Sequence, residues 1–137
     1  MTRNDKEYLF HLLQDIYFDN IDTAKADEAA EAMHNDVRWV HNQVWEHDAH
    51  KTNIRDTLNG QKEVREFLRK RIVEMQIEGI IHKVENVVSD GKLGAFKANV
   101  IGTDKSKKPF FGLVELKDDK IIYYRVCLLY TSDAADE

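Results

Sequence analysis

Cysteine is almost absent from this 137-residue sequence: the single Cys127 leaves residues 1–126 without a thiol for a disulfide, a nucleophile or a metal site. Long apolar runs are also missing, since no window approaches the roughly eighteen apolar residues of a membrane span. The opening MTRNDKEYLF lacks the apolar region of a signal peptide. The net charge is −5 with both signs interspersed, so no basic surface is offered to nucleic acid. We therefore expect a cytoplasmic protein that binds neither nucleic acid nor membrane.

The composition is typical of one soluble domain, with 42% hydrophobic and 33% charged residues. Three helices are predicted from the helical period of the apolar residues. The first begins at Asp5 and carries one apolar stripe: Leu9, Leu12, Leu13, Ile16 and Tyr17. After a turn at DNID, Thr23 is expected to cap an alanine-rich second helix over residues 24–34. The third follows Gly60 over residues 61–76, with the stripe Val64, Phe67, Leu68, Ile72 and Met75.

Strand patterns fill most of the remaining sequence. Residues 37–45 alternate, so that Val37, Trp39 and His41 share one face, whereas residues 46–59 have neither period and are predicted to form a long loop. Four further strands, over residues 79–91, 92–104, 108–119 and 120–126, are separated by short turns and predict an antiparallel meander. The sequence therefore predicts an α+β fold in which a curved antiparallel sheet wraps around three helices and leaves an internal pocket.

The last residues, CLLYTSDAADE, follow the final strand without a stop signal. One codon choice for them closely resembles the transposon-end adapter used to prepare DNA for sequencing. We therefore interpret residues 127–137 as a non-native tail, and residues 1–126 as a single domain from an environmental sequence, truncated in or after its last strand. The alternative is a genuine acidic terminus.

Four segments, in this order and spacing, resemble the nuclear transport factor 2-like superfamily. They are HNDVRWVH, NGQKEVREFL, HKVENVVSDGKLGAFKANVIG and FFGLVELKDDKIIYYRV. Within the superfamily the chain is similar to the SnoaL-like group, which includes polyketide cyclases, ketosteroid isomerase and limonene epoxide hydrolase. The resemblance implies a cone-shaped, cystatin-like roll with a deep apolar pocket, and a homodimer formed through the sheet.

The resemblance assigns roles only in part. In the isomerase branch a carboxylate in the first strand is the base, and His41 stands at that position here. Histidine still suits this task, because its ordinary pKa of about 6.5 permits proton abstraction near neutral pH. The Asp–Arg–Asp set of the epoxide hydrolase branch is absent, since Val126 follows Arg125. In the cyclase branch the acid or base lies late in the chain, where the tail has replaced a catalytic residue or none.

The segment WVHNQVWEHDAH contains the densest polar chemistry, with His41, His47 and His50 beside Glu46 and Asp48. These groups include good zinc ligands, but the H-x5-H-x2-H spacing matches no helical zinc motif. The alternative is a solvated loop with surface histidines. We expect no metal and no cofactor.

The predicted site centres on His41, which is either a general base or a core histidine bonded to backbone. Glu115, on a face shared with Phe111 and Leu113, is the second candidate, because desolvation among apolar neighbours disfavours its ionised form. Tyr123 or its neighbour Tyr124 is a candidate donor to a carbonyl oxygen, and Tyr123 is the one we assign. The ligand-binding wall is predicted to comprise Trp39, Trp45, Phe67, His82, Phe96 and Phe111. Strand alternation alone does not tell which sheet face is inside.

Two functions follow from this site. The first is a cofactor-free isomerase or cyclase that acts by acid/base chemistry on a small apolar carbonyl compound. The second is a non-catalytic ligand-binding or dimeric scaffold domain.

Overall fold

The computed structural model describes residues 4–42 and 55–128. Its helical segments are α1 (Asp5–Phe10), the π-helix η1 (His11–Phe18), α2 (Asp19–Asp22), α3 (Ala26–Ala30) and α4 (Gln61–Glu78). Its strands are β1 (Met33–Asn42), β2 (Arg55–Asn59), β3 (Ile81–Ser89), β4 (Leu93–Ile101), β5 (Lys107–Lys117) and β6 (Lys120–Leu128). Within the described residues, no helix is both long and apolar enough to cross a membrane.

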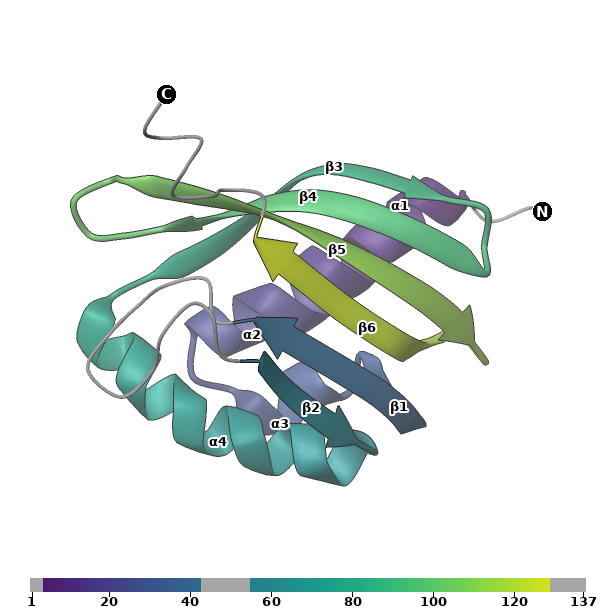
Figure 1. Ribbon diagram of the computed structural model, residues 1–137, viewed down its shortest axis with the longest axis horizontal. Coiled ribbons are helices and arrows are strands. Elements are labelled where there is room, and N and C mark those ends of the chain that lie inside the picture. The colour runs from purple at the N-terminus through teal and green to yellow at the C-terminus, as the bar shows by residue number, and fades with distance from the viewer. Residues whose placement is uncertain (1–3, 43–54, 129–137) are drawn as a thin grey trace.

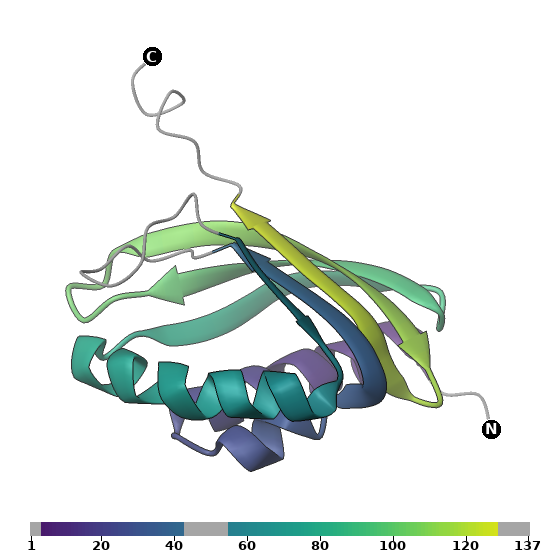
Figure 2. The same ribbon diagram turned by 60° about the horizontal axis from the view of Figure 1, so that its bottom comes forward.

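One six-stranded sheet, in the order β2-β1-β6-β5-β4-β3, forms the body of the fold. The meander β3 to β6 is antiparallel throughout, as predicted, and β1 joins it by pairing parallel with β6. The sheet curves over the helices, which all lie on its concave side (Figures 1 and 2). The predicted α+β class, with a curved sheet around helices, is confirmed, although the β1–β6 pair makes the sheet mixed.

After Phe18, the N-terminal helical region of the structure differs from the one predicted from the sequence. The expected turn DNID is the helix α2, which continues directly from η1. Thr23 ends this helix by donating a hydrogen bond from Oγ1 to the Asp19 carbonyl at 2.8 Å, so it does not cap the next one. Ala24 then adopts a positive φ of 64°. The second predicted helix shrinks to α3, because β1 already begins at Met33, where it pairs with Ile121 of β6.

The predicted loop over residues 46–59 is wrong at its end. Residues 55–59 form β2, which pairs antiparallel with β1 and sets Leu58 opposite Trp39. The segment was missed because RDTLN lacks a clear apolar alternation. The third helix was predicted well: Gly60 turns the chain at a φ of 93°, and Val64, Leu68 and Ile72 of α4 are buried against the sheet.

Register shifts between paired strands change which side chains point inward. In β3 the register shifts between Val84 and Asn86, so Val87 is buried and Asn86 is exposed. Opposite Glu115 and Leu116 the register shifts in β6, where Ile122 is skipped between Ile121 and Tyr123. A bulge inserts one unpaired residue and thereby reverses the alternation beyond it.

Candidate functional site

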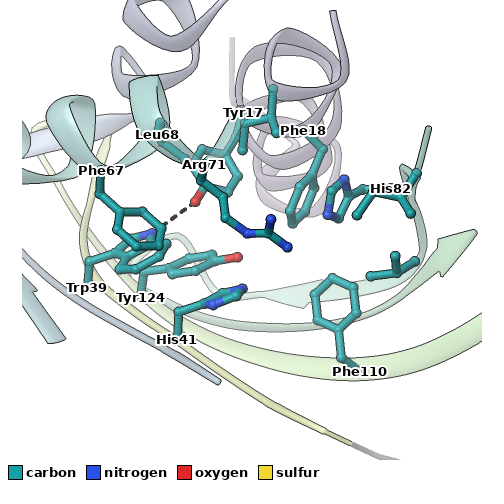
Figure 3. A pocket seen from close by; sticks show the side chains of 13 residues that line it. Tyr17, Phe18, Trp39, His41, Phe67, Leu68, Arg71, His82, Phe110 and Tyr124 are labelled. Atoms are coloured by element: carbon teal, nitrogen blue, oxygen red, sulfur yellow. Dashed lines mark hydrogen bonds between the residues drawn. The ribbon is translucent and has the colours of Figure 1, made fainter. Parts of the chain in front are cut away.

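A cavity lies between the helices and the concave face of the sheet (Figure 3). Its volume is about 40 Å³, which is room for a few water molecules. The wall is largely aromatic and includes Tyr17, Phe18, Trp39, Phe67, Phe110 and Tyr124. Three polar side chains complete it: His41 from β1, Arg71 from α4 and His82 from β3. An apolar enclosure with a few convergent polar groups is the usual form of a small-molecule site, although such pockets are commonly larger, roughly 300–1,000 Å³.

Trp39 fixes one side of this cavity. Its indole Nε1 donates a hydrogen bond to the Tyr17 hydroxyl at 2.9 Å. Its ring also stacks on His41, with centroids 5.0 Å apart, and on Tyr124, with centroids 5.8 Å apart. These contacts restrain the His41 imidazole at the cavity wall.

Two tyrosine hydroxyls lie beside this cluster. Burial raises the pKa of Tyr17, although hydrogen bonds with Trp39 and Tyr124 partly oppose the shift. Burial also raises the pKa of Tyr124, and the neighbouring Tyr17 adds to the effect. Both hydroxyls are therefore neutral at physiological pH, so they are able to donate hydrogen bonds.

His82 is held by Asp22, the last residue of α2. The ring nitrogen Nδ1 of His82 lies 2.7 Å from Oδ1 of Asp22, and the His82 backbone N–H donates to Oδ2 at 2.8 Å. A carboxylate accepts, so the ring proton is assigned to Nδ1 and Nε2 is left as an acceptor. The imidazole also stacks on Phe18, with centroids 5.1 Å apart. This His–carboxylate pair is the arrangement by which proteins orient a histidine base.

Gln14 holds the same stretch of β3 from the other side. Because β3 is an edge strand, its outer backbone groups need partners outside the sheet. The buried Gln14 amide donates to the His82 carbonyl at 3.1 Å and accepts from the Val84 N–H at 2.7 Å. Its Nε2 also donates to Asp19 at 2.8 Å. The side-chain amide thus pairs with β3 as a neighbouring strand would.

The π-helix η1 supplies Gln14, Tyr17 and Phe18 to this region. Its wide turn is closed by the Asp19 N–H, which donates to the Gln14 carbonyl, a spacing of five residues. π-Helical turns are rare and occur often at functional sites.

Four predicted site residues meet at the cavity: His41, Trp39, Phe67 and His82. Phe96 is buried behind the wall, where its ring contacts Phe18 and Phe110. Whether His41 acts as a base stays a prediction. Trp45, with His47 and His50, lies outside the described residues.

Glu115, Tyr123 and Phe111 lie on the convex face of the sheet, so placing them beside His41 was wrong. Glu115 and Phe111 are exposed, whereas their neighbours Val114 and Phe110 are buried. Tyr123 faces the same side, and Tyr124 takes the inward position. Strand alternation correctly places neighbouring residues of a strand on opposite faces of the sheet. It does not tell which of the two faces is the concave one.

Arg71, Asp22, Gln14 and Tyr17 were not predicted as site residues. Arg71 had a detectable signal, because it lies seven residues after Val64 and three after Leu68, on the apolar stripe of α4. Asp22 had none, since it stood in the presumed turn.

A second hollow lies on the convex face, with a volume of about 680 Å³. It is open and mostly apolar, and its lining includes Val88, Phe111, Leu113, Tyr123 and Arg125. Among the described residues, no group of three or more His, Cys, Asp or Glu side chains is placed to hold a metal ion.

No protein-family model matches this chain, and the comparison with curated proteins gives no match. Solved structures do match. A proposed ketosteroid isomerase from Kribbella flavida aligns with a TM-score of 0.63 and 16% identity, over 93% of this chain and 82% of that one. An LEH-like epoxide hydrolase from M. tuberculosis aligns with a TM-score of 0.62 and 14% identity, over 90% and 84%.

An NTF2-like protein with a cystatin-like fold from Novosphingobium aromaticivorans aligns with a TM-score of 0.65 and 13% identity, over 96% of this chain and 86% of that one. At these identities the likeness concerns the fold alone. The chain therefore has the NTF2-like, cystatin-like fold, which confirms at that level the resemblance inferred from its sequence.

Proposed function

We propose that the chain binds a small apolar carbonyl compound in the concave-face cavity and moves a proton on it, as a cofactor-free isomerase or cyclase does. The observation that carries this proposal is the His82–Asp22 pair, with Nδ1 and Oδ1 2.7 Å apart, at the wall of an aromatic cavity. A histidine oriented in this way has Nε2 available as a general base.

The proposed step is the removal of a proton from the carbon next to the carbonyl. The C–H bond breaks, its proton passes to Nε2 of His82, and its electron pair forms the enolate. Asp22 stabilises the resulting imidazolium, as the carboxylate does in other His–carboxylate pairs. Return of the proton from Nε2 to a different carbon completes an isomerisation. Attack by the enolate carbon on a second carbonyl of the same molecule, whose oxygen then takes the proton from Nε2, completes a cyclisation.

The developing oxyanion needs a hydrogen-bond donor. We assign the role of this donor, which the sequence analysis gave to Tyr123, to Tyr124, whose neutral hydroxyl belongs to the cavity wall. His41 lines the same cavity and is a second candidate for proton transfer. The cavity is partly open, and its volume of about 40 Å³ holds only part of such a ligand, so the rest of the ligand would lie in the opening.

Exchange of α-protons for deuterium tests this proposal. Methyl 4-oxopentanoate and cyclopentanone in D₂O would be followed by proton NMR with wild-type protein and the H82Q and D22N variants. Loss of a general base slows proton transfer by about 10²- to 10⁴-fold, so H82Q is expected to reduce exchange to this extent. The matched control is H11Q, which breaks an exposed His–Asp pair, His11 with Asp15 at 2.9 Å. Wild-type exchange no faster than buffer, or equal in H82Q, would contradict the proposal.

A non-catalytic, dimeric scaffold is the second candidate, and the convex-face hollow favours it. In a two-fold symmetric dimer the same surface of each copy meets its counterpart, so that surface must be self-complementary. This face has exposed apolar side chains and charges of both signs, namely Phe111, Leu113, Arg125 and Glu115. We propose that a second copy of the chain covers it. Sedimentation at increasing concentration should give a dimer that L113E dissociates, while V73E on the exposed side of α4 leaves it intact. A wild-type monomer at every concentration would remove this candidate.

A further inference from the structure

The opening of the concave-face cavity is marked by the lining side chains that are partly exposed. Most of the described residues that line the cavity are buried, and three of them are only partly buried: His41, Phe67 and His82. A lining side chain that also reaches solvent lies where the cavity meets the surface. Phe67, from α4, is the hydrocarbon side chain among the three (Figure 3). An aromatic ring therefore borders the opening through which a ligand would enter.

The Phe67 ring is held less firmly than the rings around it. Trp39 is fixed by its hydrogen bond to Tyr17 at 2.9 Å, and His82 is fixed by Asp22. The Phe67 side chain has no polar atom, and among the described residues its ring contacts one other ring, that of Trp39, with centroids 5.2 Å apart. Phe67 can therefore be replaced by a shorter residue without breaking a hydrogen bond of the site.

The cavity volume makes this border important for the size of the ligand. The enclosed part measures about 40 Å³, so most of a ketone would lie in the opening, against Phe67. The buried rings behind the opening belong to the core and yield little, because protein interiors are close-packed. In an apolar pocket a single methylene group changes the discrimination between two substrates by about 10- to 200-fold. The side chain at position 67 therefore limits the part of the ligand that lies outside the enclosed volume.

We propose that Phe67 determines the specificity of this site: a compact ketone fits beside its ring, and a bulkier ketone is excluded by it. This inference rests on the proposed function, because it takes the concave-face cavity as the ligand site. It is nevertheless a separate claim, since it concerns which ketones bind and not whether a proton is moved. Phe67 takes no part in the chemistry, and His82 keeps the role of base.

The test compares cyclopentanone with cyclooctanone, which has the same carbonyl group in a larger ring. Binding would be measured by NMR titration in wild type, F67A, F67L and the control F10A, with the Trp39 indole N–H as the reporter of the cavity. F67A should raise the affinity for cyclooctanone relative to cyclopentanone by about tenfold or more, and F67L should raise it by less. F10A should leave this ratio unchanged, because Phe10 is an exposed phenylalanine of α1 outside the cavity lining.

The ratio of the two affinities serves as the control for folding, since a general loss of affinity or of folded protein affects both ketones alike. If F67A does not fold, F67L decides the question, because its shorter side chain must still raise the ratio. A ratio in the folded variants equal to that of wild type would overturn the inference. So would titrations that leave the Trp39 indole signal unmoved in both wild type and F67A.

The two proposals fail separately. Exchange of α-protons on these ketones, with a ratio of affinities that F67A leaves unchanged, would keep the proton transfer and remove the role of Phe67. A size preference that F67A relaxes, without exchange on either ketone, would keep the role of Phe67 in binding and remove the enzymatic function.

Discussion

Phe110 and Phe111 are neighbours in β5, yet they lie in opposite environments. Phe110 is 2% exposed and forms part of the cavity wall, whereas Phe111 is 48% exposed and lines the open hollow on the convex face. The next strand repeats the contrast, with Tyr124 buried and Tyr123 on the outer side. Both sheet faces therefore carry aromatic residues at similar spacing.

The difference lies in what surrounds these rings. On the concave face, helices supply Tyr17, Asp22 and Arg71, so that polar groups are oriented and removed from water. No described helix covers the convex face, as Figure 2 shows. Acid/base chemistry needs oriented and desolvated groups, and association needs exposed apolar area, so the two faces suit different tasks.

The sharpest test of the contrast replaces each phenylalanine by alanine. F110A should lower the free energy of unfolding by about 3–5 kcal/mol, because it leaves a cavity in the core. F111A should lower it by no more than about 1 kcal/mol, because its ring is half exposed. Urea denaturation of both variants measures the two values. Similar losses would contradict the assignment of the faces.

Gly112 tests how tightly the concave face is packed. A Cβ atom added there would overlap Cε1 of Phe96, whose ring fills the space left by the glycine. G112A should therefore cost about 1–3 kcal/mol of stability through overpacking. L113A, one residue further on the convex face, is the control for urea denaturation. A neutral G112A would mean that the Phe96 ring moves freely.

A substitution of Gln14 tests whether the helical region holds β3 in place at His82. Q14L keeps the approximate volume but leaves the His82 carbonyl and the Val84 N–H without this partner, at a cost of about 1–3 kcal/mol. Hydrogen exchange at Val84 should accelerate, and the ring nitrogen signals of His82 should change. The Val88 amide, further along β3, provides the comparison. Unchanged exchange at Val84 would show that β3 does not need the hydrogen bonds of the Gln14 amide.

The buried tyrosines predict a loss of stability in alkali. Their pKa values are raised in the folded state, so the stability that they contribute is complete below the unfolded value of about 10 and falls as the pH rises above it. Y124F should flatten this decline between thermal melts at pH 9 and pH 11, whereas Y123F should not. An identical loss of stability in Y124F and wild type would show that ionisation of Tyr124 is not its cause.

Much of the fold was predictable because it follows from periodicity. The stripe from Val64 to Ile72 and the four alternating strands after Gly79 appear in the structure nearly as the sequence indicates. The placement of Trp39 and His41 on one face was also predictable, since they lie two residues apart in one strand. The periodicity of the apolar residues does not, however, predict the π-helix η1 or the strand β2.

The site was predictable only in part. Alternation cannot tell the concave from the convex face, and this ambiguity led to Glu115, Tyr123 and Phe111 being assigned inward. The register shift after Val84 depends on pairing with β4, which no local pattern encodes. The pairing of Asp22 with His82 joins residues sixty positions apart and requires the tertiary fold.

The most direct test of the account is a nitrogen-detected NMR titration of wild type with methyl 4-oxopentanoate and cyclopentanone. The account predicts that the largest shifts occur at the His82 ring, the Trp39 indole N–H and the Arg71 guanidinium, with the convex strand positions unmoved. Shifts confined to Phe111, Leu113 and their neighbours, with His82 and Trp39 unchanged, would contradict it and assign ligand binding to the other face.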